Sequence, residues 1–211
     1  MPRALSKGEI ESFRCRLIAA AEQLFAEQGP GAVSMRQLAA ALGVSPMTPY
    51  RYFKDKEEIL AAARASGFDR FAEALETAFA QSEDPEIRAQ TVGAAYIRFA
   101  FENPAAYRLM FDLSQPNEAD YPDLVRAGDR ARKTMSAYCQ GLLDAGLLEG
   151  DPLELAHLFW AAIHGLVVLK LADKLAPELD FERLWTDLGR ALSIGFGPGA
   201  AHIGREPNRA A

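Results

Sequence analysis

The segment that decides the fold is residues 35–60, which read MRQLAAALGVSPMTPYRYFKDKEEIL. Its first part places apolar residues at helical spacing after Ser34, a residue type that caps helices, and Gly43 ends this helix at a tight turn. A short third helix is predicted over residues 46–52. Asp55, followed three residues later by Glu58, has the pattern of a capping box at the start of a longer helix. With an amphipathic helix upstream, these are the proportions of a helix-turn-helix unit.

Helical patterns also fill the sequence on both sides of this segment. Residues 9–27 have the periodicity of an amphipathic first helix, and the helix that starts at residue 55 continues to about residue 81. No alternating β-branched run and no hairpin signal is found. Further helices are predicted over residues 85–103, 104–112, 122–144, 151–173 and 180–195, with a loop over 113–121. The expected fold is all-α, a three-helix helix-turn-helix domain followed by a larger C-terminal helical bundle, with about nine helices in total.

Length and composition indicate an ordinary folded protein. The chain has 211 residues, of which 49% are hydrophobic and 25% charged, and this balance argues against a disordered or collagen-like chain. We expect a helix-turn-helix domain over residues 1–54 and a ligand-sensing and dimerisation domain over residues 55–195. The remaining residues, 196–211, are rich in Gly, Pro and Ala and are expected to be a disordered tail.

Signals for export or membrane insertion are not found in the sequence. The two cysteines, Cys15 and Cys139, lie far apart, which gives no support to a disulfide framework or a zinc ribbon. The basic N-terminal residues are not followed by an apolar stretch, so they do not form a signal peptide. The longest nearly uncharged run, residues 156–169, is shorter than the roughly 18 to 20 residues that span a bilayer. We therefore expect a cytoplasmic protein with no membrane role.

The charge is distributed unevenly along the chain. Residues 1–56 carry eight basic and five acidic side chains, whereas the remainder carries 15 basic and 24 acidic ones. This asymmetry favours a small cationic module that meets a polyanion, attached to an acidic body that does not. Ordinary solvated faces would give a similar count, so the charge alone leaves both interpretations open.

Residues 35–60 resemble the TetR family of bacterial one-component transcription regulators. The resemblance extends back to Ala21 and covers about the first quarter of the chain, and its strongest part is the Tyr-x-Tyr-Phe-Lys-Asp-Lys-Glu run at residues 50–57. Pro49 departs from the family pattern, which usually has a larger apolar residue there. A proline is accommodated if Thr48 is the cap and Pro49 the first helical residue, and the register of the third helix stays open.

The same segment contains the side chains that reading a DNA groove requires. Thr48 and Arg51 suit base edges, and Arg36 suits a bidentate contact with guanine. Tyr50 and Tyr52 offer hydroxyls to phosphates, although both could equally be packing aromatics. Lys56 lies in the first turn of the next helix, whose dipole favours a phosphate, although it could be a solvated charge. With the contacts that the family resemblance implies, the predicted DNA-binding residues are Ser34, Arg36, Pro46, Met47, Thr48, Tyr50, Arg51, Tyr52 and Lys56.

The acidic body is rich in aromatic and apolar residues, which either fill a core or line a small-molecule cavity. Residues 159–165, FWAAIHG, together with residues 96–110, resemble a class of TetR-type C-terminal domains with a tryptophan, histidine, glycine signature. We expect an unidentified apolar or aromatic effector. Candidate ligand-binding residues are Phe68, Phe71, Tyr96, Phe99, Tyr107, Met110, Phe111, Met135, Tyr138 and Trp160.

A single reading helix covers few base pairs, so specific binding requires two half-sites and hence a homodimer on a palindromic operator. The last two helices offer more apolar area than one subunit need bury, and the family resemblance implies a four-helix interface there. Candidate interface residues are His157, Trp160, Ala161, His164, Val168, Leu184, Leu188 and Leu192.

Two other interpretations of the body stay open. In one, the body is a module for a protein partner instead of a ligand sensor. In the other, the chain is an all-helical metal-dependent enzyme built on Glu154, His157 and His164. Zinc usually needs a further ligand that no other His or Cys cluster supplies, so we expect no metal, no cofactor and no enzymatic activity.

Overall fold

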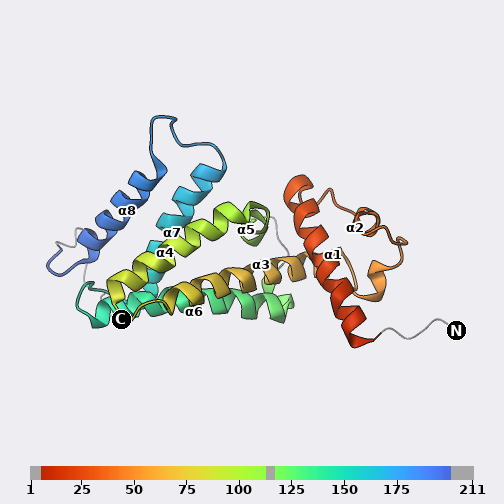
Figure 1. Cartoon of the computed structure of the whole chain (residues 1–211), viewed down its shortest axis with the longest axis horizontal. Helices are drawn as coiled ribbons and strands as arrows, with labels where there is room; N and C mark the ends of the chain where they lie inside the picture. Colours follow the sequence, from red (N-terminus) through yellow and green to blue (C-terminus); the bar gives the residue numbers. More distant parts are fainter. Residues whose placement is uncertain (1–5, 113–116, 201–211) are drawn as a thin grey trace, which may run out of the picture. The chain divides into compact units, whose positions relative to one another are not determined.

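The computed structural model describes residues 6–112 and 117–200 (Figure 1). Within these residues the fold is all-α, without a strand, which confirms the predicted fold class; eight α-helices are close to the nine helices expected. The elements are α1 (Lys7–Gln28), α2 (Met35–Ala41), η1 (Pro49–Arg51), α3 (Lys56–Phe79), α4 (Pro85–Glu102), α5 (Pro104–Met110), η2 (Glu118–Asp120), α6 (Pro122–Asp144), α7 (Pro152–Leu171) and α8 (Phe181–Phe196).

Side-chain caps fix helix starts where the sequence predicts them. The Ser34 hydroxyl accepts a hydrogen bond from the Gln37 N–H, and the Gln37 side chain accepts one from the Ser34 N–H, which completes a capping box on α2. The carboxylates of Asp84, Asp151 and Asp180 accept backbone N–H groups in the first turns of α4, α7 and α8. Each such cap stabilises its helix by about 1 kcal/mol.

The predicted third helix over residues 46–52 is wrong in its extent. The structure has a single 3-10 turn, η1, with Thr48 immediately before it and Pro49 as its first residue. Backbone N–H groups here bond three residues back, from Thr48 to the Ser45 carbonyl (2.8 Å) and from Arg51 to the Thr48 carbonyl (3.1 Å). Pro46 and Pro49 have no N–H to donate, so an α-helical ladder cannot form across them.

Contacts divide the chain into two compact units. The first comprises residues 1–74 and 98–132, and the second comprises residues 75–97 and 133–211. Helices α3, α4 and α6 each contribute residues to both units. The predicted domain boundaries at residues 54 and 195 stay predictions, because this division groups the beginning of α3 with the helix-turn-helix segment.

Two irregular segments differ from simple expectation. Within the predicted loop over residues 113–121, η2 occupies residues 118–120, while residues 113–116 lie outside the described residues. In the predicted tail, Phe196 is the last residue of α8, and its carbonyl accepts a hydrogen bond from the Glu149 N–H (2.7 Å). Residues 201–211 of that predicted disordered tail also lie outside the described residues.

The first unit contains a hydrophobic core around the helix-turn-helix segment. Leu38 and Phe53 are buried, and Leu42 and Val44 pack against the same cluster. Leu109 of α5 belongs to this cluster too. The other buried members come from α1, the segment before α2 and the start of α3: Phe13, Leu17, Ala21, Phe25, Val33, Ile59, Leu60 and Ala63.

Ion pairs join the helices of the first unit. Arg70 of α3 pairs with Glu22 of α1, whose pKa is raised by burial, an effect that the Arg70 charge opposes. Asp69 pairs with both Arg126 and Arg130 of α6. These pairs connect α3 to α1 and to α6.

In the second unit, α8 packs against α4 through a glycine. A β-carbon at Gly93 would lie only 2.7 and 2.8 Å from the Cζ2 and Cη2 atoms of the Trp185 indole. Real side chains do not approach so closely, so Gly93→Ala must displace the indole, and we expect a loss of about 1–3 kcal/mol in the free energy of unfolding. Urea unfolding followed by tryptophan emission measures this loss.

Gly128→Ala is the matched control for that substitution. A β-carbon at Gly128 of α6 would meet the Arg132 side chain at an ordinary 3.7 Å. Alanine is the better helix former, so we expect this variant to keep or slightly exceed the wild-type stability. Equal unfolding free energies for the two variants would contradict the proposed packing.

Candidate DNA-binding interface and apolar surface

Residues 45–53 around η1, here called the recognition turn, present exposed side chains of the predicted types. Met47 is 68% exposed and Tyr50 is 48% exposed. Arg51 and, on the neighbouring α2, Arg36 are exposed as well, and Thr48 is half-buried. Exposed cationic and aromatic side chains gathered around a turn between two helices suit the reading of a groove.

Three of the predicted DNA-binding residues also have structural partners. The ring of Tyr52 stacks on Phe13, with ring centroids 4.2 Å apart, which agrees with the packing interpretation of this tyrosine. The Lys56 ammonium donates a hydrogen bond to the Pro30 carbonyl at 2.8 Å. The hydroxyl of Ser34 belongs to the α2 cap. These contacts orient the side chains, and an ammonium with three N–H donors retains capacity for a phosphate.

Arg14 was missed by the sequence interpretation. Its guanidinium donates to the Tyr52 carbonyl and lies over the Phe53 ring, with Cζ 4.0 Å from the ring centroid. Tyr52 lies 38 positions away in the sequence, so no local pattern indicates the contact. Arg14 therefore joins α1 to the end of the recognition turn.

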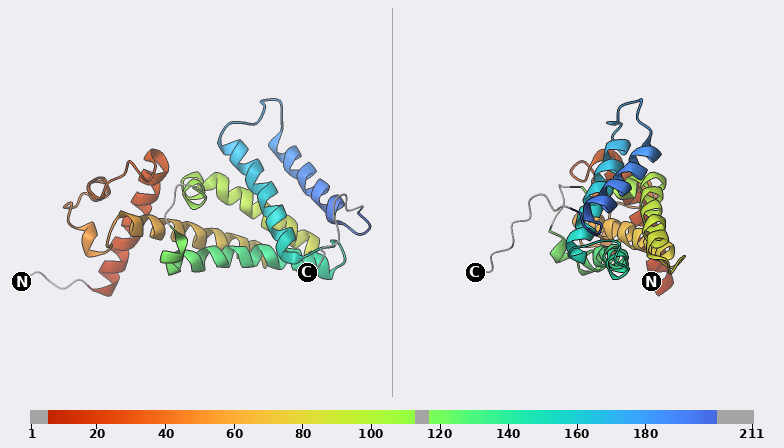
Figure 2. Two further views of the ribbon diagram at one scale, coloured as in Figure 1. Left: turned by 180° about the vertical axis from the view of Figure 1, so that it is seen from behind. Right: turned by 90° about the vertical axis from the view of Figure 1, so that its left-hand side faces the viewer.

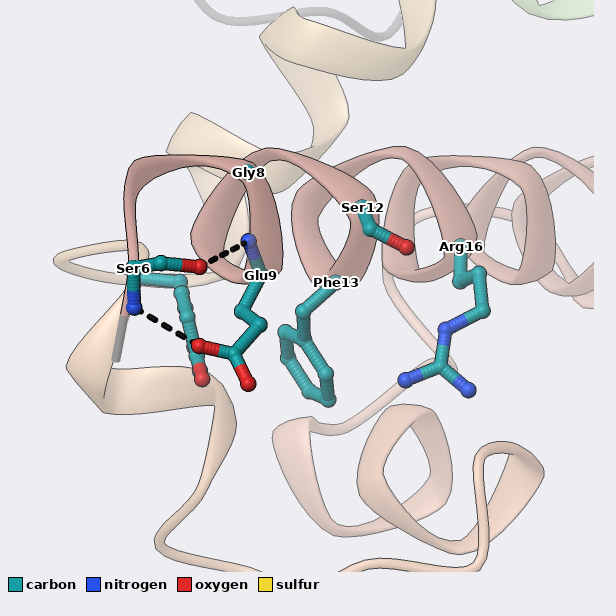
Figure 3. A pocket seen from close by; sticks show the side chains of 7 residues that line it. Ser6, Gly8, Glu9, Ser12, Phe13 and Arg16 are labelled. Carbon is teal, nitrogen blue, oxygen red and sulfur yellow. Dashed lines mark hydrogen bonds between the residues drawn. The ribbon is translucent and has the colours of Figure 1, made fainter. Parts of the chain in front are cut away.

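An open pocket of about 520 Å³ lies beside this contact (Figure 3). Its lining includes Tyr52 and residues of α1, and Figure 3 shows Phe13 and Arg16 projecting from α1 toward the same side. The capping box of α1 forms one end, with the Ser6 N–H donating to the Glu9 carboxylate at 2.7 Å. Hydrogen bonds from Ser6 hold the pKa of Glu9 below its ordinary value. This cap places the start of α1 at Lys7, two residues before the predicted start.

The predicted ligand-binding residues are mostly buried and are divided between the two units. In the first unit, Phe71 and Phe99 have ring centroids 5.1 Å apart, and Tyr107 and Phe111 have theirs 4.9 Å apart. Phe68 lies edge-on to Phe111 at 5.6 Å. The residues of the first unit are Phe68, Phe71, Phe99, Tyr107, Met110 and Phe111, and those of the second are Tyr96, Met135, Tyr138 and Trp160.

A chain of hydrogen bonds crosses the second unit between α4 and α7. The Trp160 indole N–H donates to the Tyr96 hydroxyl at 3.1 Å, and that hydroxyl lies 3.3 Å from Nδ1 of His164. An indole N–H can only donate, so the tyrosine proton is directed to the imidazole when the imidazole is neutral. Burial lowers the pKa of His164, which favours that neutral form. The tryptophan and histidine of the predicted signature are thus joined through Tyr96.

This arrangement predicts a stability that falls in mildly acidic solution. Because the pKa of His164 is lower in the folded protein than in the unfolded chain, the unfolded chain binds the proton more readily. The stabilising effect is therefore present above about pH 6.5, the ordinary histidine value, and is lost as the pH falls. We expect the Tm to decrease between pH 7 and pH 5.

His164→Asn should flatten this decrease, because an amide keeps a hydrogen-bond acceptor but does not titrate. Thermal unfolding of the wild type and the variant in a pH series measures the difference. A wild-type slope in the His164 variant would assign the titration to other groups.

Helices α7 and α8 lie side by side in the second unit, as Figures 1 and 2 show from three directions. An apolar surface runs along them in a single chain. On α7, Ala161, Gly165 and Val168 follow His157 at helical spacing, and all four are exposed. The other predicted interface residues are half-buried: Trp160, His164, Leu184, Leu188 and Leu192.

Helix α7 is more apolar than the sequence estimate implied. Its 20 residues, with a mean hydropathy of 1.5, are long and apolar enough to cross a membrane, a criterion that core helices of soluble proteins also meet. The length expected from residues 156–169 was too small, because that range covers only the nearly uncharged run and not the whole helix. Only 22% of the apolar stretch is buried in one chain. Such a helix needs a partner for its exposed face.

The three residues of the metal hypothesis do not form a metal-binding group. Across residues 6–112 and 117–200, no three His, Cys, Asp or Glu side chains lie together in a way that could hold a metal ion. Nδ1 of His157 instead lies 2.7 Å from the Leu153 carbonyl. Burial raises the pKa of the Cys139 thiol to about 11.

Comparisons with known proteins match both parts of the chain. Residues 17–63 match the family described as bacterial regulatory proteins, tetR family, and residues 89–192 match the tetracyclin repressor-like C-terminal domain. An uncharacterized HTH-type transcriptional regulator of Mycobacterium tuberculosis is 30% identical over 101 residues, which are 48% of this chain. The chain therefore spans about half the length of that relative (50%). The tryptophan, histidine, glycine subclass of the C-terminal domain stays a prediction.

Solved structures show the same fold. A protein of unknown function from Rhodococcus sp. RHA1 has a TM-score of 0.76 and 26% identity, and the match covers 93% of this chain and 99% of that one. A TetR family transcription regulator from Marinobacter aquaeolei has a TM-score of 0.71 and 24% identity, with 89% and 97% covered.

Proposed function

Because this chain belongs to the tetR family of bacterial regulatory proteins, a family of DNA-binding transcription regulators, we propose that it acts as a homodimeric repressor. In this proposal each subunit inserts its recognition turn into the major groove of one operator half-site. A small apolar or aromatic ligand then releases the protein from DNA. Regulators of this kind are normally not enzymes and work in the cytoplasm.

The observation that carries the proposal is the exposed recognition turn between α2 and α3. Met47 and Tyr50 are the exposed large apolar residues of this segment, and Arg36 and Arg51 supply positive charge beside them. A guanidinium can form two hydrogen bonds with guanine, and a tyrosine hydroxyl can contact a phosphate. We assign base reading to Arg36, Thr48 and Arg51. We assign contacts that position the protein on the DNA backbone to Ser34, Pro46, Met47, Tyr50, Tyr52 and Lys56.

The apolar surface of α7 and α8 supports the proposed dimer. Exposed Ala161 and Gly165 allow two helices to approach closely, and Val168, 41% exposed, supplies apolar area. A second copy of the same surface would cover these residues in a symmetric four-helix interface. A symmetric pair of recognition turns then requires a palindromic operator.

The aromatic residues of the body support the proposed ligand. Several candidates are packed core residues, so a ligand would bind among the less buried ones or in a rearranged state. To change operator occupancy tenfold, the ligand must discriminate between the DNA-bound and free states by about 1.4 kcal/mol.

The alternative function keeps the DNA-binding unit and makes the body a docking module for another protein.

Selection from a library of random duplexes, read by sequencing, tests the proposed function. We expect enrichment of an inverted repeat whose half-sites lie about one helical turn or more apart. No enrichment at low ionic strength would contradict DNA reading by this segment, and a single unpaired half-site would contradict the symmetric dimer.

The ligand is tested separately on the enriched duplex. A panel of aromatic and lipophilic compounds is screened by thermal shift, and each hit is titrated into the protein–DNA complex. We expect hits that raise the Tm to release the DNA. Compounds that raise the Tm without releasing DNA would favour the alternative in which the body has another role.

A further inference from the structure

The recognition turn consists of one 3-10 turn, Pro49–Arg51, with the residues on either side of it. Its backbone is held internally by hydrogen bonds from the N–H groups of Thr48, Arg51, Tyr52 and Phe53 to the carbonyls of Ser45, Thr48 and Pro49. These bonds set the shape of the turn, whereas its position against α1 depends on contacts between the turn and that helix.

Two consecutive residues of α1 make such contacts at Tyr52, the residue that ends the turn. Phe13 stacks on the Tyr52 ring, with an interplanar angle of 26°, and is itself only 6% exposed. The Arg14 guanidinium donates to the Tyr52 backbone carbonyl and lies over the ring of Phe53, which is 2% exposed. Both the side chain and the carbonyl of Tyr52 are thus held from α1.

We propose that Arg14 is a positioning residue for DNA recognition, which holds the end of the recognition turn against α1. This inference rests on the proposed function, in which the turn reads base edges. Arg14 is half-buried, and its planar guanidinium donates to the Tyr52 carbonyl while its Cζ lies 4.0 Å from the centroid of the Phe53 ring. A lysine ammonium has no such plane and cannot make both contacts in this geometry.

An alternative role for Arg14 is a direct phosphate contact, and the two roles predict different results. A phosphate contact depends on charge, so a lysine would make it as well as Arg14 does. Loss of the contact would weaken binding to every duplex, and would lower the slope of log affinity against log salt concentration by about the contribution of one phosphate. A positioning residue depends on shape. Its loss would weaken binding to the operator while leaving binding to unrelated DNA unchanged.

The test compares Arg14→Lys with wild type on the duplex enriched by selection and on an unrelated duplex of equal length, each over a salt series. We expect the variant to lose about tenfold in affinity for the selected duplex, with unchanged affinity for the unrelated duplex and an unchanged salt slope. Arg16→Lys is the matched control. Arg16 is an exposed arginine on the same helix that lies over Phe13 at 5.6 Å, and we expect no change in either affinity.

Several outcomes would overturn the positioning role. Wild-type affinity of the Arg14→Lys variant for the selected duplex is one. A parallel loss of both affinities is another, because it would show that Arg14 supports the folded unit as a whole and does not act on the orientation of the turn. If the wild-type protein does not distinguish the two duplexes, the proposed function fails before the role of Arg14 is tested.

Discussion

Ala161→Glu will convert the protein from a dimer into a monomer and lower its affinity for a duplex with two half-sites by at least about a hundredfold. Ala161 is exposed in the middle of the apolar stripe on α7. In the proposed interface, a glutamate there meets its own copy across the two-fold axis, and two carboxylates would be buried together without partners. Sedimentation equilibrium gives the mass, and DNA titration gives the affinity.

Lys170→Glu is the control for this substitution. It places the same charge on the same helix, at an exposed position that the helical repeat directs away from the stripe. We expect this variant to remain a dimer and to bind DNA as the wild type does. If Ala161→Glu also remains a dimer, the interface lies elsewhere; association with lipid vesicles by the wild type would instead assign the apolar surface to a membrane.

Arg36→Ala will change which sequence the protein prefers, whereas Tyr50→Ala will weaken its binding to all sequences. Arg36 is exposed in the first turn of α2, where a bidentate contact with guanine would contribute about 1–3 kcal/mol of discrimination. Loss of that contact should lower the affinity for the selected duplex by about tenfold or more. The affinity for a duplex mutated at one base pair should then approach that for the selected duplex.

Tyr50 differs because a phosphate contact carries no information about the base. It is 48% exposed at the flank of the turn. We expect Tyr50→Ala to lower the affinity for the selected and unrelated duplexes by a similar factor. Repeating the selection with each variant measures preference and affinity together. An unchanged preference after Arg36→Ala would remove this residue from base reading.

Local patterns in the sequence predicted the elements whose cause is local. Ser34 and Asp151 cap the helices they were expected to cap, because a side-chain oxygen needs only the backbone N–H groups of the next turn. Leu38 is buried, since the helical spacing of the apolar residues after Ser34 fixes its face. Ser6 and Glu9 form a capping box of the same kind, so the true start of α1 was also readable from the sequence.

Features that depend on distant residues could not be predicted. The contact of Arg14 with Tyr52 joins residues 38 positions apart, and the packing of Trp185 on Gly93 joins α8 to α4. Neither pair leaves a local signal. The form of the recognition turn is an intermediate case, because Pro49 indicated an irregularity, but proline alone does not distinguish a short α-helix from a 3-10 turn.

The central claim is that two chains read one operator together. Native mass spectrometry of the protein mixed with the selected duplex tests it most directly, because the mass gives the number of chains on each DNA molecule. The account predicts two chains on the intact inverted repeat, and a large loss of that complex when either half-site is replaced by unrelated sequence. A single chain on the intact duplex, with an affinity that is unchanged when one half-site is replaced, would contradict it.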